Sequence, residues 1–235
     1  VFAVIDFKNY RNNEPLVMKP SQVQLLIMRR PVTLFDGYQD IKLLKPEKPS
    51  SMELKMELME VMDAMILRNE ILAAYKEIDK DYLKMFQEEL KNLGARKQII
   101  DLVDDLKKDI DVVTLNMKYS YNRPRPRELA KYHGLKLNPH VEVDTPGYPS
   151  NHTAVGHLIA RVMTNYYPEK SSRFNQIANQ NSESRIALGI HFPSDVEAGK
   201  ILADNLYEKL VQSKLPKLSE SWTLNFGDIL NERTL

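Results

Sequence analysis

Three short segments of this chain place lysine, arginine, serine and histidine side chains at close spacing. In residues 118–126, a lysine is followed seven residues later by an Arg-Pro pair. Residues 148–152 read Tyr-Pro-Ser-Asn-His and directly precede an apolar helical pattern. Residues 184–195 begin with Ser-Arg, followed after five residues by a histidine and after three more by an aspartate. Phosphoryl transfer needs positive charge around the equatorial oxygens, an in-line nucleophile and an acid for the leaving oxygen. These segments together contain each kind of group.

The cationic side chains are candidates for binding a phosphoryl group. Lys118, Arg125 and Arg185 each attract an anion by up to ~4 kcal/mol at contact distance and an effective dielectric near ~20, before desolvation is subtracted. Ser150 and the first backbone N–H groups of the following helix form an anion site at a helix N-terminus. A single lysine or arginine is most simply a surface charge. Three of them at this spacing favour a phosphate site.

Two histidines are candidates for separate catalytic roles. His191 lies next to a predicted helix start, and Asp195 is close enough in sequence to reach its ring. A carboxylate on Nδ1–H would fix the tautomer and leave Nε2 free to attack phosphorus. His152, in the first turn of its helix, can donate a proton to the leaving group and then activate water. We interpret the remaining histidines as structural or surface residues: His133, His140 and His157.

Together the three segments resemble the signature of the type 2 phosphatidic acid phosphatase (PAP2) superfamily, K-x6-R-P, P-S-G-H and S-R-x5-H-x3-D. This superfamily joins lipid phosphatases, bacterial class A acid phosphatases and vanadium haloperoxidases. The resemblance covers residues 118–195 and does not reach residues 1–90. It implies a helical fold, a phosphohistidine intermediate at His191 and an acid at His152.

One position departs from the signature, because Asn151 stands where the family usually has glycine. Glycine there lets the backbone approach the phosphate closely and adopt unusual dihedral angles. Asparagine tolerates such angles better than most residues, so its backbone amide can still serve as part of the phosphate-binding site. Its side chain would either narrow the pocket or add a donor, and the sequence leaves both alternatives open.

The leading hypothesis is a soluble, metal-independent phosphomonoesterase that acts on a phosphorylated small molecule or a lipid phosphate. It needs no cofactor, and vanadate is expected as an inhibitor. The alternative is a vanadate-dependent haloperoxidase, which would hold vanadate as its cofactor in the same pocket through His191. A catalytically idle phosphate-binding protein is disfavoured, because mere binding requires neither the two histidines nor Asp195. A metal hydrolase is weaker still, because no third ligand has credible metal spacing.

The composition excludes several function classes. The chain has 235 residues, with 33 Lys and Arg against 32 Asp and Glu, so it lacks the basic excess of most nucleic-acid binders. It has no cysteine, which excludes disulfides, iron–sulfur clusters and a thiol nucleophile. No apolar run approaches ~18 residues, so we expect no membrane span. The sequence leaves oligomeric state and compartment open, and only the resemblance favours a periplasmic or secreted location.

The elements that must position these residues are predicted to be helices in a single-domain, all-α bundle over residues 1–235. Residues 1–49 are expected to be irregular because prolines interrupt them, with one short helix or strand at 21–30. A helix capped by Ser50 or Ser51 follows, and we interpret its methionine stripe as adaptable core packing. The stripe comprises Met52, Met56, Met59, Met62 and Met65.

The helical core with the catalytic residues is predicted over 95–212, with a tail at 214–235. Helices are expected from 79 or 81 to 93, over 96–118, at 126–134, from 150 to 167, over 172–188 and from 193 onward. The charges of the second of these helices are interpreted as a solvated face: Asp101, Asp104, Asp105, Lys107, Lys108 and Asp109.

Overall fold

The computed structural model describes residues 17–213, and within that range every regular element is helical. The α-helices are α1 (Gln22–Met28), α2 (Met52–Ala64), α3 (Asn69–Lys80), α4 (Lys84–Asn92), α5 (Lys97–Tyr121), α6 (Pro126–Tyr132), α7 (Asn151–Tyr166), α8 (Ser171–Ala187) and α9 (Pro193–Ser213). The predicted all-α class is therefore confirmed. None of these helices is long and apolar enough to cross a membrane. The tail predicted at 214–235 lies outside the described residues.

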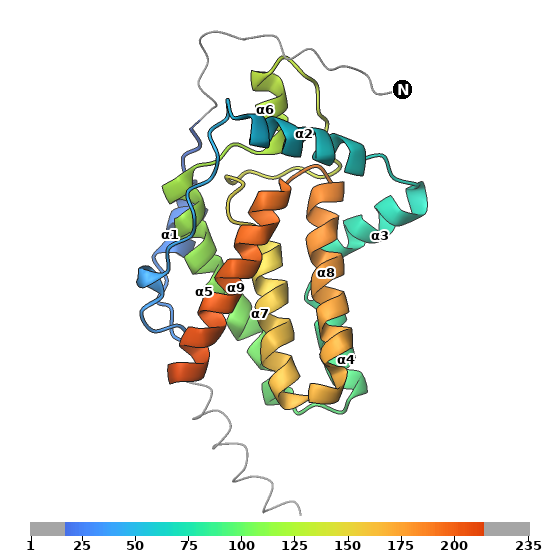
Figure 1. The fold of residues 1–235 in the computed structure, drawn as a ribbon. Coiled ribbons are helices and arrows are strands. Elements are labelled where there is room, and N and C mark those ends of the chain that lie inside the picture. The colour runs from blue at the N-terminus through green and yellow to red at the C-terminus, as the bar shows by residue number, and fades with distance from the viewer. Residues whose placement is uncertain (1–16, 214–235) are drawn as a thin grey trace, which may run out of the picture.

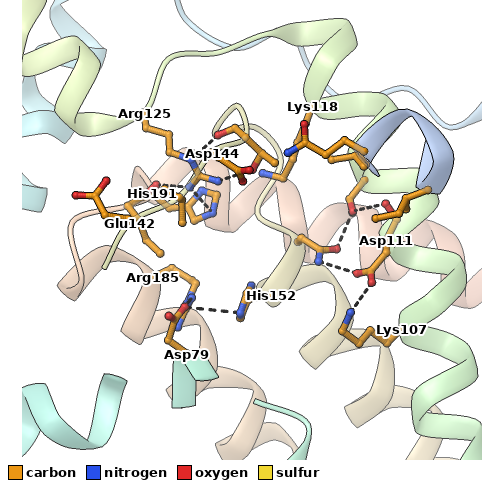
Figure 2. Close-up of a pocket in the computed structure, with 18 residues that line it drawn as sticks. Asp79, Lys107, Asp111, Lys118, Arg125, Glu142, Asp144, His152, Arg185 and His191 are labelled. Atoms are coloured by element: carbon orange, nitrogen blue, oxygen red, sulfur yellow. Dashed lines mark hydrogen bonds and ion pairs between the residues drawn. The ribbon is translucent and has the colours of Figure 1, made fainter. Parts of the chain in front are cut away.

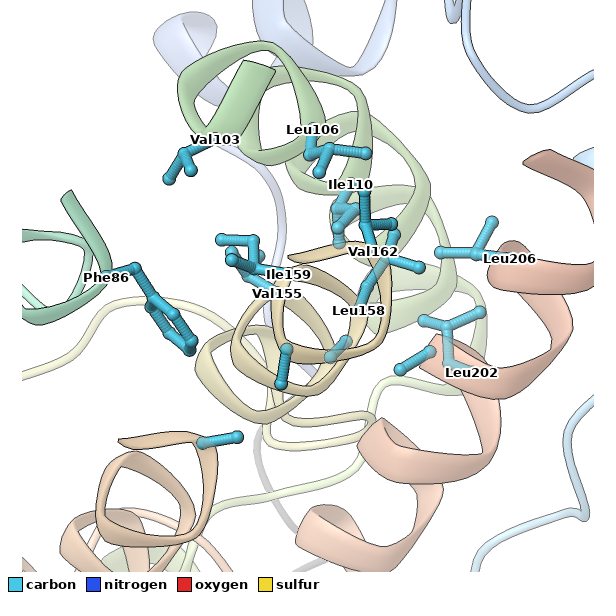
Figure 3. Close-up of a cluster of buried hydrophobic side chains, with 14 of the residues drawn as sticks. Phe86, Val103, Leu106, Ile110, Val155, Leu158, Ile159, Val162, Leu202 and Leu206 are labelled. Carbon is cyan, nitrogen blue, oxygen red and sulfur yellow. The ribbon is translucent and has the colours of Figure 1, made fainter. Parts of the chain in front are cut away.

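Helix α7 forms the centre of the bundle and packs against α5, α8 and α9 (Figure 1). Its buried apolar side chains recur at helical spacing, which is why this segment folds as a helix with several buried faces. Figure 3 shows them interleaved with side chains of α4, α5 and α9. The labelled residues are Phe86, Val103, Leu106, Ile110, Val155, Leu158, Ile159, Val162, Leu202 and Leu206. Burial of each such side chain contributes about 1.5–3 kcal/mol, so this core fixes the helix ends that carry the candidate site.

The ends of α5 and α7 bring the first two motif segments to the same end of the bundle. Helix α5 is followed by its C-cap residue Asn122, which has a φ of 49° and whose side chain donates to the Met18 carbonyl at 2.8 Å. This left-handed residue turns the chain sharply, and Pro126 then begins α6. Helix α9 approaches the start of α7 closely, since a Cβ on Gly199 would lie 2.7 Å from the Ser150 carbonyl oxygen.

Helix α2 lies across that end of the bundle (Figure 1), where it contacts α6, α8 and α9. Its N-cap is Ser51, one of the two predicted caps, and its buried residues are Leu54, Leu58 and Val61. These pack in a second apolar cluster with Leu129, Ala130, Leu137 and Phe192.

The prediction that the methionine stripe packs in the core is wrong for its first three members. Met52, Met56 and Met59 are 65%, 57% and 37% exposed, whereas Met62 and Met65 pack partly buried against the second cluster. Both the stripe and the leucines recur at helical spacing, but they lie on different faces of α2. The face with Leu54 and Leu58 is the one turned toward the bundle.

Two further expectations need correction, and the structure decides between the two alternatives left open at 21–30. The chain between α2 and α4 forms a separate helix, α3, and α4 begins at Lys84 rather than at 79 or 81. The segment at 21–30 is a helix, stabilised by a capping box between Ser21 and Gln24. Asp109 is buried rather than solvated, because its carboxylate accepts hydrogen bonds from the backbone N–H groups of residues 33–34 at 2.6 and 2.7 Å.

Candidate active site

A pocket of about 350 Å³ opens at the end of the bundle where α5, α7 and α8 meet the loop at 142–149 (Figure 2). Six of the eight predicted site residues line it: Lys118, Arg125, Asn151, His152, Arg185 and His191. The other two, Ser150 and Asp195, lie directly behind its wall and are fully buried. The motif segments therefore converge at one place.

Two of the cations are held by backbone carbonyls of the 142–149 loop. Lys118 Nζ donates to the carbonyls of Pro146 and Gly147 at 2.8 and 3.0 Å. Arg125 donates to the Thr145 carbonyl through Nε at 2.6 Å and to its hydroxyl through Nη2 at 2.9 Å. Burial lowers the pKa of Lys118 well below its usual range and that of Arg125 to about 10, because desolvation disfavours the charged forms. An anion in the pocket would offset that cost.

The third cation, Arg185, is fully buried on α8 and forms an ion pair with Asp79 of α3. Its Nη1 lies 2.5 Å from the Asp79 carboxylate, and its Nε and Nη2 donate to the Ser184 hydroxyl at 3.0 and 2.8 Å. Burial lowers the pKa of Arg185, although the Asp79 contact opposes this effect. Asp79 was not among the predicted site residues. It is a lone aspartate in an amphipathic helix, and nothing in the sequence marks such a residue as part of a site.

The imidazole of His191 lies between a carboxylate and a guanidinium. Its Nδ1 is 3.1 Å from Asp195 Oδ2, and its Nε2 is 3.1 Å from Arg125 Nη1. Because a guanidinium can only donate, Nε2 carries the lone pair and Nδ1–H donates to Asp195. This is the arrangement expected from the sequence. Burial, with Arg125 nearby, lowers the pKa of His191 well below its usual value, so the ring is neutral.

Asp195 is ionised behind the pocket wall. Burial alone would raise its pKa, but Arg123 Nη1 at 2.7 Å, the His191 hydrogen bond and the Phe192 N–H at 2.9 Å together hold it well below the usual range. Arg123 was not among the predicted residues. Its place two residues before Arg125 in an Arg-Pro-Arg-Pro sequence is a signal that could have identified it, since alternate residues of an extended segment point the same way.

His152 lines the pocket, and its ring lies beside Asp79 and Tyr82. Its Nε2 is buried and makes no hydrogen bond to any described residue, and the Asp79 carboxylate is 3.9 Å away. The ring packs against that of Tyr82, with centroids 4.1 Å apart. Burial and then the Arg185 charge lower the pKa of His152 well below its usual value. A nitrogen in this position is suited to exchanging a proton with a bound ligand.

Ser150 and Asn151 begin α7 in different ways. Ser150 is its N-cap: the hydroxyl accepts from Thr153 Oγ1 at 3.0 Å and from the Thr153 N–H at 3.5 Å. Its own N–H donates to the Asp195 carbonyl at 2.9 Å, which ties α7 to α9. A direct contact of Ser150 with phosphate stays a prediction.

The Asn151 side chain points toward α5 and forms part of the pocket wall. Its Oδ1 accepts from the Thr114 hydroxyl at 2.7 Å, and its Nδ2 donates to Asp111 Oδ1 at 2.9 Å. Asp111 also forms an ion pair with Lys107 (Figure 2). Of the two alternatives left open by the sequence, the geometry favours a side chain that narrows the pocket, because its oxygen and one amide hydrogen are already engaged.

The other histidines do not line the pocket. The Nε2 atoms of His133, His140 and His157 lie 3.1 Å from the Pro49 carbonyl, the Met65 carbonyl and the Ser182 hydroxyl respectively. Within residues 17–213, no group of three or more histidine, aspartate or glutamate side chains is placed to hold a metal ion.

The sequence profile of the PAP2 superfamily matches residues 110–203, the part of the chain that carries all of these motif residues. Over residues 110–203 the chain is similar to the PAP2 superfamily. The resemblance stated from the three motifs is therefore confirmed.

Among curated relatives, a non-specific acid phosphatase of Salmonella typhimurium is 30% identical over 113 residues, covering 46% of this chain and 45% of the relative. A non-specific acid phosphatase of Providencia stuartii is 31% identical over 94 residues, covering 40% and 38%. The match thus spans less than half the length of these relatives.

Two solved structures have a fold similar to that of this chain. A bacterial vanadium-dependent iodoperoxidase has a TM-score of 0.63 at 17% identity, covering 75% of this chain and 53% of its own. The apo form of a bacterial vanadium-dependent chloroperoxidase has a TM-score of 0.63 at 12% identity, covering 79% and 55%. At such identities the likeness establishes the fold alone.

Proposed function

We propose that this protein is a phosphomonoesterase of the acid phosphatase type, acting through a phosphohistidine at His191. The observation that carries the proposal is the Nε2 lone pair of His191, which lies in a pocket shared with three buried cations, while Asp195 holds the opposite nitrogen. The similarity to non-specific acid phosphatases supports the same activity.

In the first step, Lys118, Arg125 and Arg185 bind the phosphoryl oxygens. Arg125 Nη1 exchanges its contact with His191 for a phosphoryl oxygen and so frees Nε2. His191 Nε2 then bonds to phosphorus as the ester P–O bond breaks, and His152 gives its proton to the leaving oxygen. The positive charge that develops on His191 is stabilised by Asp195, which stays ionised.

In the second step, water attacks phosphorus, the P–N bond breaks, and inorganic phosphate is released. His152 takes the proton of the attacking water and is thereby ready for another cycle. The buried cations stabilise the charge on the transferring group in both steps.

The proposal extends to substrate, organisation and location. The substrate is a phosphorylated small molecule or a lipid phosphate that reaches the pocket from solution. Residues 95–212 form the helical core that carries the catalytic groups, within a single domain. A periplasmic or secreted location fits the resemblance to bacterial acid phosphatases.

The test is turnover of para-nitrophenyl phosphate in excess chelator, with acid-quench trapping of a labelled phosphoenzyme in wild type and His191→Ala. We expect undiminished activity in chelator and a label that the variant lacks. Activity that is lost in chelator and restored only by added metal would refute the metal-independent mechanism.

Halide oxidation should be assayed together with phosphatase activity, because the same pocket could also hold vanadate. Its imidazole and three cations suit a tetrahedral oxyanion such as vanadate, which would supply peroxide activation when bound. Fast, saturable bromide oxidation with vanadate and peroxide, without phosphatase activity, would establish the haloperoxidase alternative.

A further inference from the structure

Arg123 has no part in the mechanism above, yet it is one of the most buried charges beside the site. It is 2% exposed and does not line the pocket. Its Nη1 lies 2.7 Å from Asp195 Oδ1, and its Nη2 lies 3.0 Å from Glu57 Oε2. One guanidinium therefore bridges the carboxylate that holds His191 and a second carboxylate from α2.

Glu57 contacts the start of α9 as well as Arg123. Its Oε1 accepts from the Ser194 N–H at 2.7 Å, and its Oε2 accepts from the Ser194 hydroxyl at 2.7 Å. The same hydroxyl accepts from Arg123 Nη1 at 2.7 Å. A carboxylate at a helix N-terminus is stabilised by the helix dipole. Glu57 thus fixes the turn of α9 that carries Asp195, although it lies 137 residues away from Ser194 in the sequence.

The surroundings leave Arg123 and Asp195 little freedom to reorient. The Arg123 guanidinium carbon lies 4.7 Å from the centre of the Phe192 ring and 5.8 Å from that of Tyr148. On the other side of Asp195, a Cβ on Gly147 would come within 3.0 Å of Oδ2. The direction of the Asp195 carboxylate is consequently set by the groups that bind it, of which Arg123 is the charged one.

We propose that Glu57 is a positioning residue for the nucleophile: it holds Arg123, and through it Asp195, so that His191 keeps its Nε2 lone pair toward the pocket. The inference rests on the proposed function and deepens it, because it makes α2, which lies outside residues 110–203, part of the catalytic apparatus. Without the Glu57 charge, the Arg123 guanidinium is balanced by Asp195 alone. The carboxylate then stabilises the developing imidazolium of His191 less.

The experiment compares Glu57→Gln and Glu57→Ala with the control Glu60→Gln. Glu60 is exposed on the same helix, three residues further on. For para-nitrophenyl phosphate we expect kcat to fall roughly 10- to 100-fold in both Glu57 variants, as for other small misplacements of catalytic groups. KM should stay within about twofold because Glu57 does not line the pocket. The control should match wild type.

A second readout is independent of turnover. In protein labelled with ¹⁵N-histidine, the His191 ring, assigned through His191→Gln, should titrate at lower pH in the Glu57 variants, and the acid limb of kcat/KM should move the same way. The charged and titratable groups that face His191 are the same in all of these proteins: Lys118, Arg125, His152, Arg185 and Asp195.

Folded Glu57 variants with wild-type kcat and an unmoved His191 titration would overturn the inference. So would a kcat that falls only as the folded fraction falls, with the titration unmoved, since that is a purely structural effect. A wild type without phosphatase activity, in which the Glu57 variants still move the titration, would refute the proposed function and support the coupling of Glu57 to His191.

Discussion

Replacing Asp195 with asparagine tests how the His191 tautomer is fixed. In the native structure, the carboxylate accepts from three donors: Arg123 Nη1 at 2.7 Å, His191 Nδ1 at 3.1 Å and the Phe192 N–H at 2.9 Å. The first binds Oδ1, and the other two bind Oδ2. Asparagine has the same shape but offers one acceptor and one donor, so it cannot satisfy both sides.

Each orientation of the asparagine amide has a definite consequence. With its oxygen toward Arg123, the NH₂ group faces His191 Nδ1, which must become an acceptor. The ring proton then moves to Nε2, where it points at Arg125 and blocks attack. With the amide reversed, the NH₂ group faces the Arg123 guanidinium. Either orientation leaves buried donors opposed, at a cost of about 1–3 kcal/mol for each unsatisfied group.

We therefore expect Asp195→Asn to lower kcat roughly 10³- to 10⁴-fold, the size of loss that the wrong tautomer causes in serine protease triads. Stopped assays with para-nitrophenyl phosphate measure kcat, and denaturant unfolding measures the accompanying loss of stability. Glu197→Gln, an exposed change two residues along α9, is the matched control. A kcat within tenfold of wild type in folded Asp195→Asn would refute the tautomer argument.

Four further predictions follow from the same geometry. His152→Ala should slow hydrolysis of the phosphoenzyme for every substrate, because His152 takes the proton of the attacking water. It should slow formation of the phosphoenzyme by about 10²- to 10⁴-fold only for an alkyl phosphate, whose leaving oxygen needs a proton; burst kinetics with both esters check this. Burial lowers the pKa of both His152 and His191, so both rings are protonated only at acidic pH. We expect kcat/KM to rise as pH falls below neutrality, because His152 gains its proton, and to fall again once His191 is protonated. A pH profile of kcat/KM with its optimum above about 8 would contradict this. Vanadate should inhibit competitively below about 1 mM, since its five-coordinate form resembles the transition state, as inhibition kinetics would show. Asp109→Ala should destabilise the fold by about 1–3 kcal/mol in urea unfolding, because its buried carboxylate is the acceptor for the N–H groups of residues 33–34, whereas exposed Asp105→Ala should change little.

The helices that form the core could be predicted to within a few residues, and the connecting ones could not. Helices α5, α7 and α9 each carry a sustained apolar stripe, and α8 lies between Pro168 and Gly189, so periodicity and chain breakers mark these helices. Residues 65–68, by contrast, contain neither proline nor glycine. The break between α2 and α3 is set by packing against the bundle, which local propensity does not encode.

For the candidate site, six residues that line the pocket could be predicted, but most of the groups that hold them could not. Motif spacing places Lys118, Arg125 and Arg185 at helix ends, and a bundle brings such ends together. The partners of these groups come from distant segments without a motif: Arg185 and Asp79 are 106 residues apart. A single carboxylate in an amphipathic helix looks like a solvated charge in one sequence, because its partner is defined only by the fold.

Asn151 shows that a departure from the signature can be interpreted only with its neighbours in view. As the first residue of α7, Asn151 has a right-handed helical backbone, so the conformational freedom of glycine is not required here. The larger asparagine side chain must instead find room and hydrogen-bond partners. It lies against α5, where it bonds to Thr114 and Asp111. The substitution therefore leaves the backbone N–H groups at the start of α7 in helical geometry. It also adds hydrogen bonds between α5 and α7 next to His152. These bonds help to fix the first turn of α7, which carries this candidate acid.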